Sequence, residues 1–239
     1  MKKILLLAVS FITYITAFSQ GTIIGNTTYD VQTNNGSKNR IIVYDDGTIS
    51  TVWTGSTDPT TVSPTFSDRG TFYNRFDGTS WGAYPTERIE DVRTGFVEIL
   101  KVDDHEVSMG HYAVTASEFN IRLFANEEPG GTTWTETGGS AEVTGLWAFT
   151  HCPEGTDDIY IVAANLNPPT QFNFSRSDDG GETWSVLNSE LPFLTTADGI
   201  PSVAGAAESY QIRTHGSDVY VLFGMTNSDL VLLHSNDYG

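Results

Sequence analysis

Short apolar runs rich in β-branched and aromatic residues recur from residue 40 to the end of the chain, separated by turns rich in glycine and aspartate. Runs of this length and composition predict β-strands rather than helices. Three stretches open alike, with an apolar run after Gly95, Gly145 and Gly199. Each continues with a second run (residues 106–114, 157–164 and 217–225) and a third run (residues 119–125, 172–177 and 230–234).

These stretches behave as repeats of nearly constant length. Two of them end in Gly-x-Thr-Trp, at Trp134 and Trp184, each 39 residues after its opening glycine. A more divergent first unit has runs at 40–44, 48–53 and 70–75 and reaches Trp81. Four short strands about every 50 residues is the period of β-propeller blades. We therefore predict an all-β propeller of four-stranded antiparallel blades, three full and a fourth incomplete; the alternative is a β-sandwich, whose strands lack such a unit.

One turn motif is complete. Residues 177–184, Ser-Asp-Asp-Gly-Gly-Glu-Thr-Trp, fit the pattern Ser-x-Asp-x-Gly-x-Thr-Trp at every fixed position. The aspartate can accept hydrogen bonds from turn amides, glycine tolerates positive φ, and tryptophan buries a large ring between sheets. The motif therefore predicts a structural turn rather than an active site. Its residues are Ser177, Asp179, Gly181, Thr183 and Trp184.

The last five residues repeat the first half of this motif. Ser235, Asp237 and Gly239 match its Ser-x-Asp-x-Gly, and Ser235 lies 58 residues after Ser177. We therefore expect the chain to be part of a longer propeller. Residues 22–31 are then expected to supply a closing strand to a last blade.

The motif resembles the Asp-box, or BNR repeat, of sialidase-like propellers. From residue 20 onward the whole chain resembles secreted bacterial BNR-repeat propellers of the sialidase superfamily, and residues 39–41 through 93–95 read like their N-terminal region. Many of these proteins carry a sorting domain for type IX secretion. The resemblance implies a secreted or cell-surface protein that uses this secretion machinery.

The N-terminus has the pattern of a secretory signal peptide. Lys2 and Lys3 precede an apolar stretch at residues 4–17, and Ala17 and Ser19 are the small residues of a cleavage site. This stretch is too short and wrongly flanked for a stable membrane span, although a retained anchor is the alternative. We predict a signal peptide at residues 1–19, a propeller domain at residues 20–239, and no membrane span after cleavage.

Composition and residue spacing exclude several classes of partner and cofactor. The formal charge is −18, with 30 acidic against 12 basic side chains, which argues against nucleic acids and anionic membranes as partners. The single cysteine, Cys152, excludes an intrachain disulfide. Neither zinc nor calcium spacing appears, so no metal or cofactor is predicted. His151 and Cys152 are adjacent, and strand neighbours are expected to face opposite sides of a sheet.

The resemblance to sialidases implies a set of catalytic residues. A sialidase would need an arginine triad, an aspartate acid/base and a Tyr–Glu nucleophile pair. Arg40 stands at the place of the first triad arginine, with Ile42 where its motif has proline, and Asp68 is a candidate acid 28 residues later. The alternative is that Arg40 is an ordinary strand-start charge and Asp68 a turn residue. The other triad arginines and the Tyr–Glu pair cannot be placed.

Acidic pairs recur at the turn between the first and second strands of each unit. They are interpreted as solvated turn residues rather than catalytic carboxylates: Asp45-Asp46, Asp103-Asp104 and Asp157-Asp158. The sequence therefore favours a non-catalytic binding or surface-display module with a glycan or protein ligand, rather than an enzyme. The alternatives are a sialidase-type exo-glycoside hydrolase with Arg40 as carboxylate anchor, and a propeller-type assembly factor.

Overall fold

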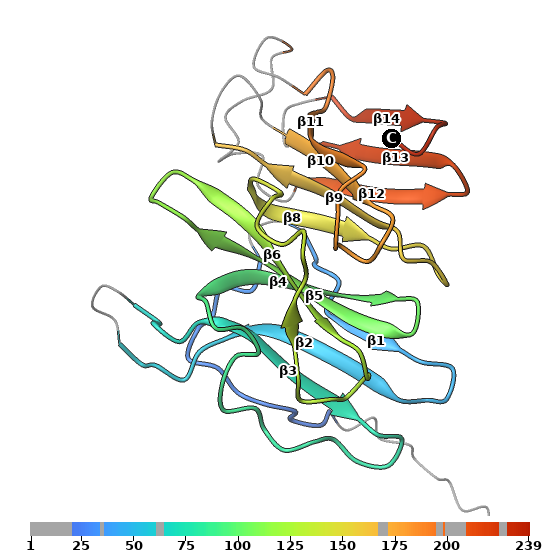
Figure 1. Ribbon diagram of the computed structural model, residues 1–239. Helices are drawn as coiled ribbons and strands as arrows, with labels where there is room; N and C mark the ends of the chain where they lie inside the picture. Colours follow the sequence, from blue (N-terminus) through green and yellow to red (C-terminus); the bar gives the residue numbers. More distant parts are fainter. Residues whose placement is uncertain are drawn as a thin grey trace, which may run out of the picture.

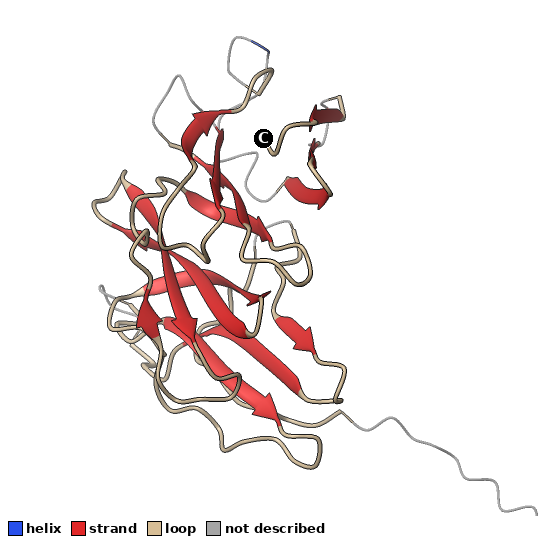
Figure 2. Cartoon of the chain, turned by 45° about the vertical axis from the view of Figure 1, so that its right-hand side comes forward, coloured by secondary structure: helices blue, strands red, loops and turns tan. Residues whose placement is uncertain are grey.

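The computed structural model describes residues 21–33, 36–60, 65–166, 172–194, 198, 209–224 and 229–239. In these residues the chain is all-β, as predicted, with four antiparallel sheets and no α-helix (Figures 1 and 2). The described part contains no helix of the length and apolarity needed to cross a membrane. The predicted signal peptide lies outside the described residues.

Within each sheet, every strand pairs with the next strand along the chain. Sheet 1 contains β1 (Ile41–Val43), β2 (Ile49–Gly55) and β3 (Gly70–Phe76). Sheet 2 contains β4 (Thr94–Val102), β5 (His105–Ala113), β6 (Phe119–Asn126) and β7 (Thr135–Glu136). Sheet 3 contains β8 (Leu146–His151), β9 (Ile159–Ala164), β10 (Phe172–Ser177) and β11 (Val186–Glu190). Sheet 4 contains β12 (Tyr210–His215), β13 (Asp218–Phe223) and β14 (Val231–Ser235).

Sheet 1 departs from the predicted four-stranded unit. It has three strands, and an isolated bridge between Phe76 and Trp81 stands where the fourth was expected. Asp77 accepts hydrogen bonds from the backbone N–H groups of Thr79 and Ser80, so the chain turns tightly there and pairs at a single point. Residues 22–31 form no strand; this segment is fixed to sheet 1 by contacts such as the hydrogen bond from Thr28 N to the Ser56 carbonyl (2.9 Å).

The sheets stack on one another in chain order, from the blue end to the red end of Figure 1. Three apolar clusters fill the spaces between sheets 1 and 2, 2 and 3, and 3 and 4. Strand β9 shows the consequence, because all six of its residues are buried. Ile159 and Ile161 pack toward sheet 2, whereas Tyr160 and Val162 pack toward sheet 4. A strand covered on both faces is apolar throughout instead of alternating.

The first strands of sheets 2 and 3 share one irregularity. Their register shifts between Gly95 and Glu98 in β4 and between Leu146 and Phe149 in β8. Within these bulges Phe96 has φ of 56° and Trp147 has φ of 52°, in the left-handed region that aromatic residues rarely adopt. The two rings meet edge to face, with centroids 6.5 Å apart. The same strained conformation therefore recurs at equivalent positions in the first strands of two neighbouring sheets.

The turn at residues 177–184 is held by its own side chains. Asp179 accepts hydrogen bonds from Thr183 N (2.8 Å), Thr183 Oγ1 (2.6 Å) and Ser177 Oγ (2.8 Å). Ser177 Oγ also accepts one from Gly181 N (2.8 Å). Trp184 donates from Nε1 to the Gly139 carbonyl of sheet 2's last turn (2.8 Å). The turn therefore joins β10 to β11 and fixes sheet 3 to sheet 2.

Replacing Asp179 by alanine is expected to lower the free energy of unfolding by about 1–3 kcal/mol, because it removes the acceptor shared by the donors of Ser177 and Thr183. Burial opposes ionisation of Asp179, but the bonds from Thr183 and Ser177 outweigh it and lower its pKa. A lowered pKa stabilises the fold above the ordinary aspartate pKa, and that stability is lost as pH falls through the lowered value. The difference in denaturation midpoint between the two proteins should therefore shrink in acid. The exposed neighbour Asp178, replaced by alanine, is the control.

Candidate functional site

A cavity of about 470 Å³ opens where the first strands of all four sheets meet. It is lined by residues of β1, β4, β8 and β12 and of the turns that follow β1 and β8. We call it the axial cavity. Its apolar wall includes Ile41 and Val43, which are 55% and 66% exposed, and its polar residues include Asp45, Lys101, His151, Glu154 and Arg213.

Some polar side chains of the axial cavity, unlike Asn39, Tyr44 and Thr150, lack hydrogen-bond partners in the described chain. Those of Asp45, Lys101, His151 and Glu154 form no hydrogen bond within the part of the chain that the structure describes, and Arg213 donates from Nη1 to the adjacent Ile212 carbonyl (2.6 Å). Polar groups that converge on a cavity with free donors and acceptors are typical of a ligand site. In this respect these four side chains differ from the hydrogen-bonded polar groups around them.

A buried network forms the wall behind this cavity. Glu98 of β4 accepts hydrogen bonds from Thr150 N (2.9 Å), Thr150 Oγ1 (2.6 Å) and Asn39 N (3.3 Å). Asn39 and Thr150 line the cavity and belong to the segments of sheets 1 and 3 that face it. Lys38 donates from Nζ to the Ala148 carbonyl and lies over the Phe149 ring, 4.2 Å from its centroid. Glu98 thus links three sheets where their first strands converge.

The titratable groups of this region are shifted mainly by burial. Burial raises the pKa of Glu98, while the positive charge of Lys38 acts in the opposite direction. Burial, together with the charge of Arg213, lowers the pKa of His151 to about 4, so the imidazole is neutral at pH 7. Burial raises the pKa of Cys152 to about 11, which leaves its thiol unreactive. Contrary to the expectation from alternation, His151 and Cys152 line the same cavity, because β8 ends at His151.

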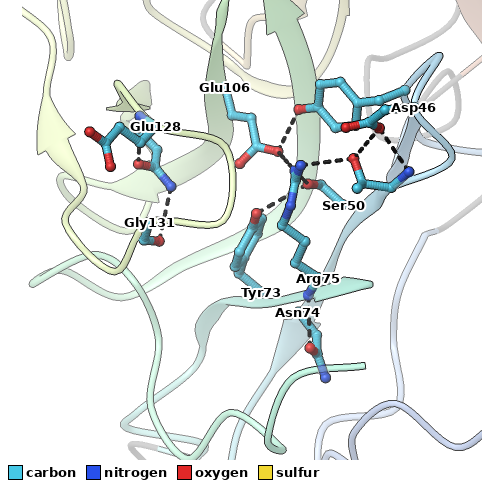
Figure 3. A network of polar contacts seen from close by, with 11 residues as sticks. Asp46, Ser50, Tyr73, Asn74, Arg75, Glu106, Glu128 and Gly131 are labelled. Carbon is cyan, nitrogen blue, oxygen red and sulfur yellow. Dashed lines mark hydrogen bonds and ion pairs between the residues drawn. The ribbon is translucent and has the colours of Figure 1, made fainter. Parts of the chain in front are cut away.

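A second polar network lies between sheets 1 and 2 and reaches the cavity wall at Tyr44. Figure 3 shows Arg75, Tyr73, Ser50 and Glu106 converging between sheets 1 and 2. Tyr44, which lines the axial cavity, donates to Glu106 Oε1 (2.6 Å), and Arg75 Nη1 lies 3.4 Å from the same oxygen. Burial, then Glu106, raises the pKa of Tyr44, and the same causes raise that of Tyr73 to about 12. Glu106 is fully buried, so this Tyr–Glu pair fixes the position of Tyr44 and does not open on the cavity.

The two residues singled out from the sequence lie elsewhere. Arg40 faces a separate cavity of about 460 Å³ beside β2, where its Nη1 is 3.4 Å from Gln32 Oε1. Asp68 accepts hydrogen bonds from Ser56 and from both Thr57 N (2.7 Å) and Thr57 Oγ1 (2.6 Å). Burial alone would raise the pKa of Asp68, but these bonds lower it to about 2. The structure brings neither residue into the axial cavity or into contact with the other, and their roles stay predictions.

The axial-cavity residues are the ones that sequence reasoning missed. Asp45 belongs to the recurring acidic pairs, but its pattern is that of any hairpin turn. Lys101, Glu154 and Arg213 carry no motif. The signal available was positional, since each lies in the later part of a first strand or in the turn that follows it.

No protein-family model and no curated protein matches this chain. Among solved structures, Zg3597, a family 117 glycoside hydrolase of Zobellia galactanivorans, shares 12% identity at a TM-score of 0.51, over 89% of this chain and 71% of that one. A GH43 enzyme from Xanthomonas citri complexed with xylotriose shares 10% identity at 0.52, over 90% and 74%. CoXyl43, a GH43 β-xylosidase/α-arabinofuranosidase from a compost metagenome, shares 10% identity at 0.51, over 91% and 78%.

These comparisons show the fold, which is a β-propeller. They also contradict the preference for a non-catalytic binding or display module and against an enzyme, because the structures that share the fold are glycoside hydrolases. The prediction failed because it sought one family's catalytic set along the sequence, whereas the polar groups of the cavity come together only when four sheets meet. None of the three named structures is described as a sialidase or a BNR-repeat protein.

Proposed function

We propose that this protein is a glycoside hydrolase whose substrate binds in the axial cavity. The observation that carries the proposal is the presence of two carboxylates without protein partners, Asp45 beyond β1 and Glu154 beyond β8, on one cavity. Glycoside hydrolysis is performed by such a pair of carboxyl groups on either side of the scissile bond. The fold shared with glycoside hydrolases supports the same reaction class.

The reaction divides between the two carboxyl groups. One donates a proton to the glycosidic oxygen as the bond to the anomeric carbon breaks, and the leaving sugar departs with that proton. The other either activates a water molecule or attacks the anomeric carbon before water does, so that the elements of water are added across the bond. His151, neutral at pH 7, is placed to exchange hydrogen bonds with sugar hydroxyls.

We also propose a family and a cellular location for this protein. The four sheets are blades of a secreted or cell-surface BNR-repeat propeller of the sialidase superfamily, exported through its signal peptide and type IX machinery. The hydrogen-bonded turn at residues 177–184 and the apolar N-terminal stretch support this proposal.

Hydrolysis of aryl glycosides by the purified chain tests the activity. The panel contains p-nitrophenyl xylosides, arabinofuranosides, galactosides, glucosides and glucuronides in both anomers, a fluorogenic sialoside, and xylotriose. We expect turnover of at least one class above the rate in buffer. Absence of hydrolysis across the panel by protein shown to be folded would contradict the proposed function.

A further inference from the structure

Among the described residues, nearly all lysine and arginine side chains form contacts within the protein. Three arginines form ion pairs with acids: Arg75, Arg122 and Arg176. Three more donate to backbone carbonyl groups: Arg69, Arg88 and Arg93. Arg40 contacts Gln32, and Lys38 is buried against Ala148. These side chains already contact groups of the protein, so few of their donors are available to a ligand.

Lys101 and Arg213 differ from this set. Lys101 has one cation–π contact, 5.8 Å from the centroid of the Tyr44 ring, and Arg213 makes one bond to its neighbouring carbonyl. Neither forms an ion pair within the described residues. With 30 acidic side chains for 12 basic ones, acid partners are in large excess. Two cations without an acid partner on one cavity are therefore notable, and they come from sheets 2 and 4.

The charges of the axial cavity are also separated along its strands. Lys101 lies within β4 and Arg213 within β12. Asp45 and Glu154 lie in the turns beyond β1 and β8, two and three residues past the last residues, Val43 and His151. No ion pair joins the two sets within the described chain. A ligand in this cavity therefore meets cations on the strands and carboxylates on the turns.

Resting on the hydrolase function proposed above, we propose that the sugar bound in the axial cavity carries a carboxylate, as a hexuronic acid does. Arg213 and Lys101 hold this carboxylate, while Asp45 and Glu154 flank the glycosidic bond. A guanidinium offers parallel N–H donors that match a carboxylate, and an ammonium adds a point charge. The negative field of the whole protein disfavours anions, but salt screens distant charges more than adjacent ones. The contribution of Lys101 and Arg213 is therefore local.

Binding of a matched pair of sugars tests this inference without requiring turnover. D-Glucuronate and D-glucose differ at C6, where a carboxylate replaces a hydroxymethyl group. Their affinities for the full chain are measured by ligand-observed NMR titration at low salt. We expect roughly tenfold tighter binding of glucuronate, lost at high salt. Arg213→Gln should weaken glucuronate binding about tenfold and leave glucose unchanged, with a smaller effect in the same direction for Lys101→Met.

Two further variants make the result specific. Arg122→Gln, which removes an arginine paired to Glu136 outside the cavity, should bind both sugars as the parent does. Arg213→Lys should retain part of the preference, because it keeps the charge and loses the planar donors. Circular dichroism melting curves verify the fold of each variant.

The outcomes separate this inference from the hydrolase proposal. Equal binding of the two sugars, no binding of either, or a preference that survives in both Arg213→Gln and Lys101→Met would overturn the inference. If glucuronate binds with the expected preference but no glycoside in the panel is hydrolysed, the hydrolase proposal fails and the carboxylate site remains. If glycosides are hydrolysed while neutral and acidic sugars bind alike, the carboxylate site fails and the hydrolase proposal remains.

Discussion

Replacing Glu98 by alanine is expected to lower the free energy of unfolding by about 3–5 kcal/mol. The carboxylate is 1% exposed and accepts three hydrogen bonds from two neighbouring sheets. Its removal leaves Thr150 N and Asn39 N without their acceptor and removes a carboxyl group that interacts with the charge of Lys38. Urea denaturation followed by tryptophan fluorescence measures the loss, and Glu127→Ala, an exposed glutamate, is the control expected to stay within about 0.5 kcal/mol.

The pH dependence of this effect has a defined sign. Burial raises the pKa of Glu98 above its ordinary value of 4.5. A raised pKa means that the folded protein holds this proton more tightly than the unfolded chain does. The associated stability is present below 4.5 and is lost as pH rises through the folded value. As pH rises from 4.5 through the folded pKa, the parent should therefore lose stability relative to Glu98→Gln. A Glu98→Ala protein as stable as the parent would refute the network's role.

Asp45→Asn and Glu154→Gln are each expected to lower kcat/KM on the best substrate of the panel by about 10²–10⁴-fold. Each change keeps the size of the side chain and removes its ability to ionise. Neither carboxylate has a hydrogen-bond partner in the described chain, so the melting temperature should stay close to that of the parent. Initial rates give the first quantity, and differential scanning calorimetry gives the second.

The turn of sheet 2 provides a matched control for these variants. Asp104 occupies the turn between β4 and β5, as Asp45 occupies the turn between β1 and β2, but it lies outside the axial cavity. Asp104→Asn should keep full activity. Addition of azide to the two inactive variants should restore turnover only where the missing group acts as nucleophile or base. Unchanged activity in both Asp45→Asn and Glu154→Gln would remove the axial cavity from consideration as the active site.

The strands were predictable because their signal is local. β-Prone runs between Asp-Gly and Gly-rich turns fix the hairpins, and the predicted run at 157–164 differs from the observed β9 by two residues at one end. The turn at residues 177–184 is equally local. The missing fourth strand of sheet 1 is an exception with a local cause, because Asp77 closes the turn before pairing can extend.

The axial cavity was not predictable because nothing local marks it. Asp45, Lys101, Glu154 and Arg213 are far apart in sequence, and each has the appearance of an ordinary surface charge. Their convergence depends on how four sheets pack, which in turn depends on the buried faces of strands such as β9. The left-handed conformations of Phe96 and Trp147 are hidden for the same reason, since an aromatic residue gives no sequence sign of positive φ.

The network around Glu98 and Lys38 also bears on the cooperativity of unfolding. Each sheet is a meander of consecutive strands, and sheets pack mainly on their neighbours in the chain, an arrangement in which units can unfold one at a time. Lys38 breaks this pattern by reaching from the segment before sheet 1 to the Ala148 carbonyl of sheet 3, 110 residues away. Glu98, in sheet 2, bonds to residues on both sides of it. Loss of one sheet therefore costs contacts in the other two, and the array melts as a single unit rather than sheet by sheet.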